Sequence, residues 1–155
     1  RQMCIRDSIS PLPFNSILSI FDKKNKTMKV EVSNGELMDK LSILELKLKN
    51  IDDPKKLINV NTEFNELNPL VQKLFKKHNP AINKLYIKLA EINGKLWVIE
   101  DEIRQCEKDK NFGNKFVKLA RDVYFTNDVR SEIKKEINIL TNSGVIEEKS
   151  YEDYS

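Results

Sequence analysis

The stretch PAINKLYIKLAEINGKLWVIEDEIRQCEKDK, residues 80–110, decides the fold of this chain. Its apolar side chains recur at alternating intervals of three and four residues without interruption. These positions are Ile82, Leu85, Leu89, Ile92, Leu96, Ile99, Ile103 and Cys106. A stripe with this period lies along one face of an α-helix, and that face has to be buried against another apolar surface. The stretch therefore predicts one long helix that needs partners.

Residues 114–142 supply the first partner. Their stripe has the same period and consists of Phe116, Leu119, Val123, Thr126, Arg130, Ile133, Ile137 and Leu140. Phe112-Gly113-Asn114 separates the two stretches, and Asn142-Ser143-Gly144 follows the second. A short connection favours antiparallel neighbours, so residues 80–110 and 114–142 are predicted to form a long helical hairpin.

Two earlier helices are predicted between residue 33 and the hairpin. Ser33 and Glu36 fit a capping box, and Asp53-Pro54 fits the start of the next helix. Pro69 lies inside this second helix and predicts a kink or a restart capped by Asn68. The preceding KVEV, residues 29–32, alternates like a strand but has no partner strand, so we expect a short extended lead-in. The fold prediction is all-α, an antiparallel bundle of about four helices, monomeric or dimeric.

The first residues are set aside. RQMCIRDS, residues 1–8, is similar to the translated transposon end of a common DNA-library adapter, and segments of that origin do not inform the fold. We therefore expect Met28 to be the start and residues 1–27 to be an artefactual or disordered extension. Residues 28–144 are predicted to form a single helical-bundle domain, and residues 145–155 a polar tail.

Charge and cysteine content exclude some function classes. The whole chain has a formal net charge of +3, but residues 28–155 hold 22 basic and 22 acidic side chains. Without a basic excess, nucleic-acid binding is not expected. No apolar run reaches the length of a membrane span. Cys106 is the only cysteine after residue 27, which is typical of a reducing compartment, so we expect a cytoplasmic protein.

Two polar residues, Thr126 and Arg130, interrupt the stripe of residues 114–142. A buried arginine needs a carboxylate partner, because an unpaired buried charge is very costly. The candidate partners are Asp39, Glu45, Glu100 and Asp101. The hairpin register places Ile92 opposite Arg130, so we expect the nearby Gly94 to leave room for Arg130 or Asn127.

The same register predicts one polar cluster beside Trp97 and Tyr124. Its members are the candidate ligand-binding residues Asp39, Lys40, Trp97, Glu100, Asp101, Arg104, Arg121, Tyr124, Asn127, Asp128 and Arg130. One interpretation is a pocket for an anionic ligand, with arginines as bidentate donors. The other is a salt-bridge network that fixes the helix register, which is the more common meaning of such clusters.

Metal and catalytic motifs are weak. Glu36 with Asp39, and Glu63 with Glu66, place two carboxylates on one helical face, an arrangement that can hold Mg²⁺ but more often is a solvated charge pair. His78, the only histidine, and Cys106 do not make a zinc site or a nucleophile pair. We expect no metal and no cofactor, and no catalytic residue is assigned.

Several blocks of residues carry a family resemblance. They are VSNGELMDKLSILELKLKNIDDPKKL, LWVIEDEIRQCE, FGNKFVKLARDVYFTNDVRSEIKKEIN and VIEEKSY. Together they resemble a bacterial family, domain of unknown function 6165, over residues 28–151. The resemblance implies that the family's motif residues here are Gly35, Glu36, Asp39, Lys40, Glu45, Lys47, Trp97, Glu100, Asp101, Arg104, Phe116, Arg121, Tyr124, Asn127, Asp128 and Arg130. It implies no activity, but an association with glycosyltransferases of lipopolysaccharide-type surface-polysaccharide assembly.

Two functions are therefore weighed. The first is a non-catalytic helical accessory module for such enzymes, with a protein partner or self-association through its helical seams. The second is a small all-α enzyme or ligand-binding protein that uses the cluster on a phosphorylated or nucleotide-sugar ligand. The first predicts an exposed apolar stripe on the bundle. The second predicts a concave pocket lined by Arg104, Arg121 and Arg130.

Overall fold

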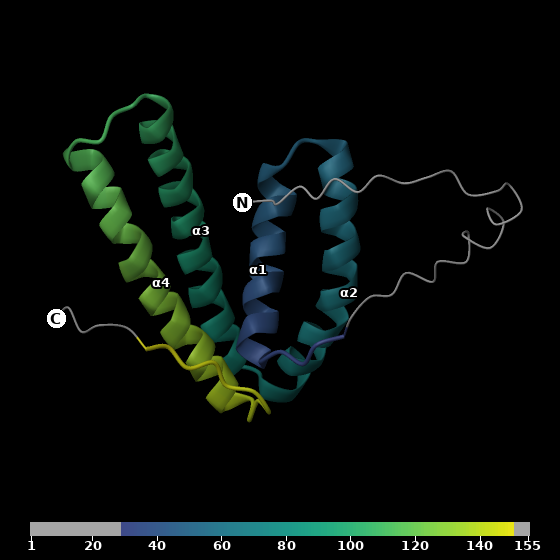
Figure 1. The fold of residues 1–155 in the computed structure, drawn as a ribbon. Helices are drawn as coiled ribbons and strands as arrows, with labels where there is room; N and C mark the ends of the chain where they lie inside the picture. The colour runs from purple at the N-terminus through teal and green to yellow at the C-terminus, as the bar shows by residue number, and fades with distance from the viewer. Residues whose placement is uncertain (1–28, 151–155) are drawn as a thin grey trace, which may run out of the picture. The chain divides into compact units, whose positions relative to one another are not determined.

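A computed structural model describes residues 29–150. The elements are α1 (Asn34–Asn50), α2 (Pro54–His78), α3 (Ala81–Lys108) and α4 (Asn114–Leu140). Figure 1 shows them as two helical pairs, α1 with α2 and α3 with α4. The predicted all-α bundle is confirmed, and residues 29–33 lie outside any helix or strand. The four helices belong to one compact unit that begins at Glu31. The interpretation of residues 1–27 falls outside the described residues.

The helix ends follow local chemistry. The Ser33 Oγ accepts a hydrogen bond from the Glu36 amide at 3.1 Å, which satisfies one free N–H of the first turn of α1. At α2, the Asp53 carboxylate accepts from the Lys55 amide at 2.9 Å. At the C-terminal end of α4, Asn142 adopts the left-handed conformation, with φ of 49°. The predicted ends at Ser33, Asp53 and Asn142 are confirmed, but the capping box is formed only in its Ser33 half, because the Glu36 carboxylate pairs with Lys134. The helix α3 begins without a side-chain cap.

Pro69 does not divide its helix. The helix α2 runs from Pro54 to His78 with Pro69 inside it, so the predicted restart at Asn68 is wrong. A proline leaves the carbonyl four residues earlier without its helical partner. Here both Pro69 and Asn65 are exposed, so water can satisfy that carbonyl and the helix continues.

The core receives side chains from all four helices. Its buried members are Met38, Leu41, Val71, Ile82, Leu89, Ile133 and Ile137. The most extensive packing is between α3 and α4, and α1 contacts each of the other three helices. The helix α3 likewise contacts each of the others, so the predicted stripes meet where α1 and α3 lie together.

The two glycines of interest have different roles. A Cβ on Gly35 would lie 2.5 Å from the Lys134 carbonyl oxygen, so α1 approaches the α4 backbone too closely for any side chain there. A Cβ on Gly94 would meet nothing within 4 Å. The expectation that Gly94 leaves room for Arg130 or Asn127 is therefore wrong, because the missing Cβ of Gly94 would point into open space.

Candidate functional site

The centre of the polar region is an ion pair between α1 and α4. The Asp39 side chain is 1% exposed and meets the Arg130 guanidinium, which is 26% exposed. Arg130 Nε donates to Asp39 Oδ1 at 2.9 Å, and Nη2 donates to Oδ2 at 2.5 Å. This bidentate geometry is the strongest arrangement of an arginine with a carboxylate. Asp39 is thus the partner of Arg130 among the four carboxylates predicted from the sequence.

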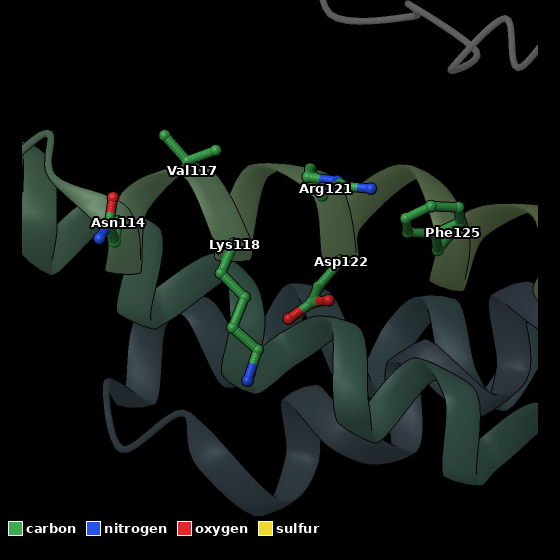
Figure 2. Close-up of a pocket in the computed structure, with 6 residues that line it drawn as sticks. All are labelled: Asn114, Val117, Lys118, Arg121, Asp122 and Phe125. Atoms are coloured by element: carbon green, nitrogen blue, oxygen red, sulfur yellow. The ribbon is translucent and has the colours of Figure 1, made fainter. Parts of the chain in front are cut away.

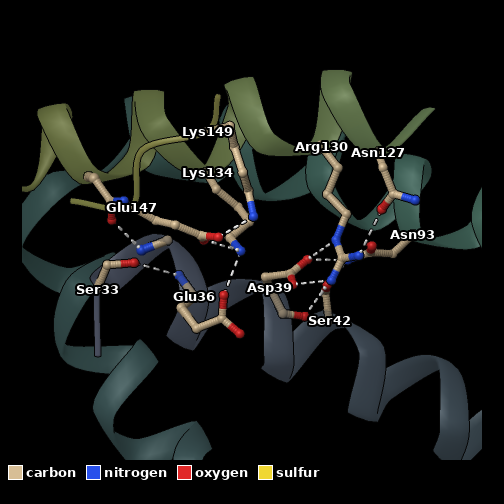
Figure 3. A network of polar contacts seen from close by, with 12 residues as sticks. Ser33, Glu36, Asp39, Ser42, Asn93, Asn127, Arg130, Lys134, Glu147 and Lys149 are labelled. Atoms are coloured by element: carbon tan, nitrogen blue, oxygen red, sulfur yellow. Dashed lines mark hydrogen bonds and ion pairs between the residues drawn. The ribbon is translucent and has the colours of Figure 1, made fainter. Parts of the chain in front are cut away.

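Side-chain amides and a hydroxyl complete this network (Figure 3). The Nδ2 of Asn93, a buried residue of α3, donates to Asp39 Oδ1 at 2.8 Å and to Ser42 Oγ at 2.7 Å. Arg130 Nη1 donates to Asn127 Oδ1 at 3.2 Å. The Asp39 hydrogen bonds to Arg130 raise the pKa of the guanidinium above its ordinary value. Three helices are therefore joined at one buried carboxylate.

A second set of contacts joins the start of α1 to the end of α4. The Asn138 Oδ1 accepts a hydrogen bond from the Gly35 amide at 2.6 Å. Lys134 Nζ pairs with Glu36 at 2.5 Å and with Glu147 at 3.1 Å. Burial alone would lower the pKa of Lys134, but the two carboxylates outweigh it and raise that pKa above the ordinary value. The Glu36 carboxylate, expected in the capping box, is thus engaged by Lys134.

A groove lies above the first network, between α1 and α3, with Arg130 of α4 at its edge. It has a volume of about 450 Å³. The lining residues are Ile43, Leu46, Asn93, Leu96, Trp97, Glu100, Asp101, Arg104 and Arg130. Arg104 pairs with Glu100 at 2.7 Å, as its spacing predicts. The two arginines of the groove are therefore each balanced by a carboxylate, and Asp101 adds a further negative charge.

The outer face of α4 carries a second kind of feature, which we call the α4 stripe. It consists of Val117, Arg121, Tyr124, Phe125, Asp128 and Val129. Val117 is 52% exposed and Val129 is 43% exposed. The Arg121 guanidinium lies 5.8 Å from the centre of the Phe125 ring, and the Tyr124 and Phe125 rings are 4.5 Å apart. Figure 2 shows Val117, Arg121 and Phe125 in succession on the side of α4 away from the other helices.

The candidate residues thus occupy several places rather than one cluster. Asp39, Asn127 and Arg130 form the buried network, and Trp97, Glu100, Asp101 and Arg104 line the groove with Arg130. Arg121, Tyr124 and Asp128 lie on the α4 stripe. Lys40 pairs with Glu63 of α2 at 2.6 Å and ties α1 to α2. The groove contains Arg104 and Arg130 but not Arg121, so the expected three-arginine pocket is present only in part.

Four buried polar residues were missed by the sequence interpretation: Ser42, Asn93, Asn138 and Thr141. Asn93 follows Ile92 in the sequence, and Asn93 and Arg130 both donate to Asp39 Oδ1. A signal existed for Ser42, because it lies three residues after Asp39 and one residue after Leu41, beside the apolar face of its helix. Asn138 follows the apolar Ile137 in the same way.

Within residues 29–150, no group of three metal-ligating side chains is found. Of the predicted carboxylate pairs, Glu36 and Asp39 face the cations Lys134 and Arg130, and Glu63 faces Lys40. Among the described helices, none is both long enough and apolar enough to cross a bilayer.

The fold and the site define a small all-α bundle whose polar residues hold three helices together and line one groove. The chain belongs to the family of unknown function DUF6165, whose model matches residues 28–154. The family resemblance seen in the sequence is confirmed by this match. No curated protein and no solved structure matches the chain.

Proposed function

We propose that this chain is a non-catalytic helical module that works by association with other protein chains, and that the α4 stripe is its main contact surface. The observation that carries the proposal is the row of exposed apolar and aromatic side chains on one helix face. Val117, Tyr124, Phe125 and Val129 are each at least 38% exposed and lie within four helical turns. Contiguous exposed apolar surface of this kind, edged by charged side chains, is typical of protein-binding sites.

The family resemblance adds a finer part to the proposal. It associates members with glycosyltransferases of surface-polysaccharide assembly, so the proposed assembly contains such an enzyme. The buried network supports a scaffold role, because the Asp39 carboxylate is buried and is engaged by both Arg130 and Asn93. A rigid helical support is what a contact surface on α4 needs.

Site-specific photo-cross-linking tests this proposal. A benzophenone side chain replaces Val117 in one protein and Ile58 in a matched control, because Ile58 is an equally apolar, 66% exposed residue of α2. Both proteins are expressed in the organism of origin, and adducts are identified by mass spectrometry. We expect a discrete adduct at position 117, either with this chain itself or with a glycosyltransferase, and none at position 58. The same adducts at both positions would contradict the proposal.

A second function is favoured by the groove. Trp97, Arg104 and Arg130 converge on one cavity, as the ligand-binding alternative requires. We propose as the second candidate that the groove binds a sugar phosphate or nucleotide sugar. A thermal-shift screen with these compounds tests it, using Arg104→Met as the variant, because Arg104 is exposed and Arg130 is structural. A shift that Arg104→Met abolishes supports the groove function, and an absent shift with every compound contradicts it.

A further inference from the structure

The charges of the α4 stripe have a polarity along the helix. Arg121 precedes the aromatic pair Tyr124–Phe125, and Asp128 follows it. Asp128 is half-buried and lines a hollow with Lys135 and residues 147–149, so its carboxylate is shared between this segment and the stripe. Arg121 and Asp128 are seven residues apart, which is two helical turns, so both lie on the same face. Their midpoint falls between Tyr124 and Phe125.

This arrangement is complementary to itself when it is reversed. If two copies of α4 pack antiparallel about a two-fold axis between Tyr124 and Phe125, Arg121 of each copy lies opposite Asp128 of the other. The aromatic pair of one copy then packs on the aromatic pair of its partner. A parallel arrangement would instead place Arg121 against Arg121. Isologous contacts of this type are the most common way for identical chains to associate.

The direction of the helix dipoles also favours antiparallel packing of two α4 helices. Antiparallel α4 helices place the positive end of one helix dipole beside the negative end of the other. Aromatic rings and arginine are also the side chains enriched at protein interfaces. The stripe therefore has the apolar centre and the opposite-charge flanks that a two-fold helix contact needs.

From this charge complementarity we infer that the partner on the α4 stripe is a second copy of the same chain, packed antiparallel, with reciprocal Arg121–Asp128 ion pairs on either side of a Tyr124–Phe125 centre. The inference rests on the proposed function, since it names the partner of that surface. It leaves the groove and the α1–α2 pair for other partners of the assembly.

Charge exchange tests the inference with three proteins. Arg121→Asp and Asp128→Arg each place like charges opposite each other, and the double variant Arg121→Asp/Asp128→Arg restores opposite charges. Sedimentation velocity over a range of concentrations should show self-association for the wild type and the double variant, and monomers for each single variant. Mixing the two single variants should restore association, because each contact then joins opposite charges. Lys84→Asp, with the same charge change at an exposed position of α3, is the control and should associate like the wild type.

Circular dichroism confirms that each variant is folded before its association is compared. A wild type that remains monomeric, or single variants that associate as well as the wild type, would overturn the inference. If the wild type is monomeric while position 117 cross-links to another protein, the second-copy inference fails and the proposed function stands. If position 117 also gives no specific adduct, both fail.

Discussion

The two ends of the α3–α4 hairpin differ in burial although their sequence stripes are equally regular. At the end where α3 begins and α4 ends, Ile82, Leu89 and Ile137 have no exposed surface, because α1 and α2 cover them. At the turn end, Ile103 and Phe116 are only half-buried. Figure 1 shows the turn end of this hairpin apart from the α1–α2 pair. We call these parts the junction end and the turn end.

The difference shows that heptad-like periodicity reports which face of a helix is apolar, but not how many neighbours cover it. The polar contacts of α1 with α4 and with the residues that follow α4 fall between Arg130 and Ser143, at the junction end. The turn end has α3 and α4 packed on each other, and its outer face carries the α4 stripe. Stability is therefore concentrated at one end of the hairpin, and the contact surface at the other.

The largest effect is expected from breaking the buried ion pair at the junction end. Arg130→Met leaves the Asp39 carboxylate buried without its cation, which should cost about 3–5 kcal/mol of unfolding free energy. Arg104→Met, which breaks an exposed pair near the turn end, should cost about 1 kcal/mol or less. Urea denaturation of both variants makes the comparison. The double variant Asp39→Leu/Arg130→Met should recover part of the loss, and equal costs for the two single arginine variants would contradict the assignment.

Truncating one apolar side chain at each end of the hairpin should show how differently the two ends are packed. Ile137→Ala at the junction end removes a fully buried side chain and should destabilise by about 2–5 kcal/mol. Ile103→Ala at the turn end should cost clearly less, because its half-buried side chain has fewer atoms around it. The same denaturation experiment measures both changes. A larger loss for Ile103→Ala would mean that the turn end is covered in solution, as a dimer through that end would produce.

The two glycines should respond in opposite directions. Gly35→Ala forces a methyl group against the Lys134 carbonyl, and such overpacking costs about 1–3 kcal/mol. Gly94→Ala meets open space and replaces a poor helix former with a good one, which should stabilise by about 0.5–1 kcal/mol. Thermal denaturation of the pair gives the signs directly. A destabilising Gly94→Ala would show that α3 is covered at that point.

The smallest effect is expected from acid at the C-terminal segment. The cations Lys149 and Lys134 lower the pKa of Glu147 below its ordinary value of 4.5. A carboxylate with a lowered folded-state pKa stabilises the fold above its ordinary pKa, and this contribution is lost as the pH falls through the lower folded value. The NMR chemical shifts of residues 145–150 should therefore move toward random-coil values as the pH falls below about 4.5. Glu147→Gln should remove this step, and an unchanged step would assign it to another carboxylate.

The sequence was sufficient for the helices, their caps and the need of Arg130 for a carboxylate, because these depend on local periodicity and on the cost of a buried charge. The sequence placed Asp39 among four candidate carboxylate partners of Arg130. It could not identify the right one, because that depends on which helices α1 packs against. It missed Asn93 and Ser42, because short polar side chains beside an apolar stripe look like surface residues. It grouped Arg121 with the groove, because a helical register does not say which side of α4 faces outward.

The hydrogen bond from the Gly35 amide to Asn138 links residues 103 positions apart. During synthesis it can form only after nearly all of the helical domain has been made. The first two amides of α1, those of Asn34 and Gly35, donate to Ser143 Oγ and Asn138 Oδ1, and the Asn34 side-chain amide donates to Thr141 Oγ1. A nascent chain emerges with its N-terminus first, so the beginning of α1 waits for almost the whole domain before it is closed. Ribosome-bound chains that stop before residue 138 should therefore keep a frayed first helical turn, however well the apolar core of α1 and α2 has already formed.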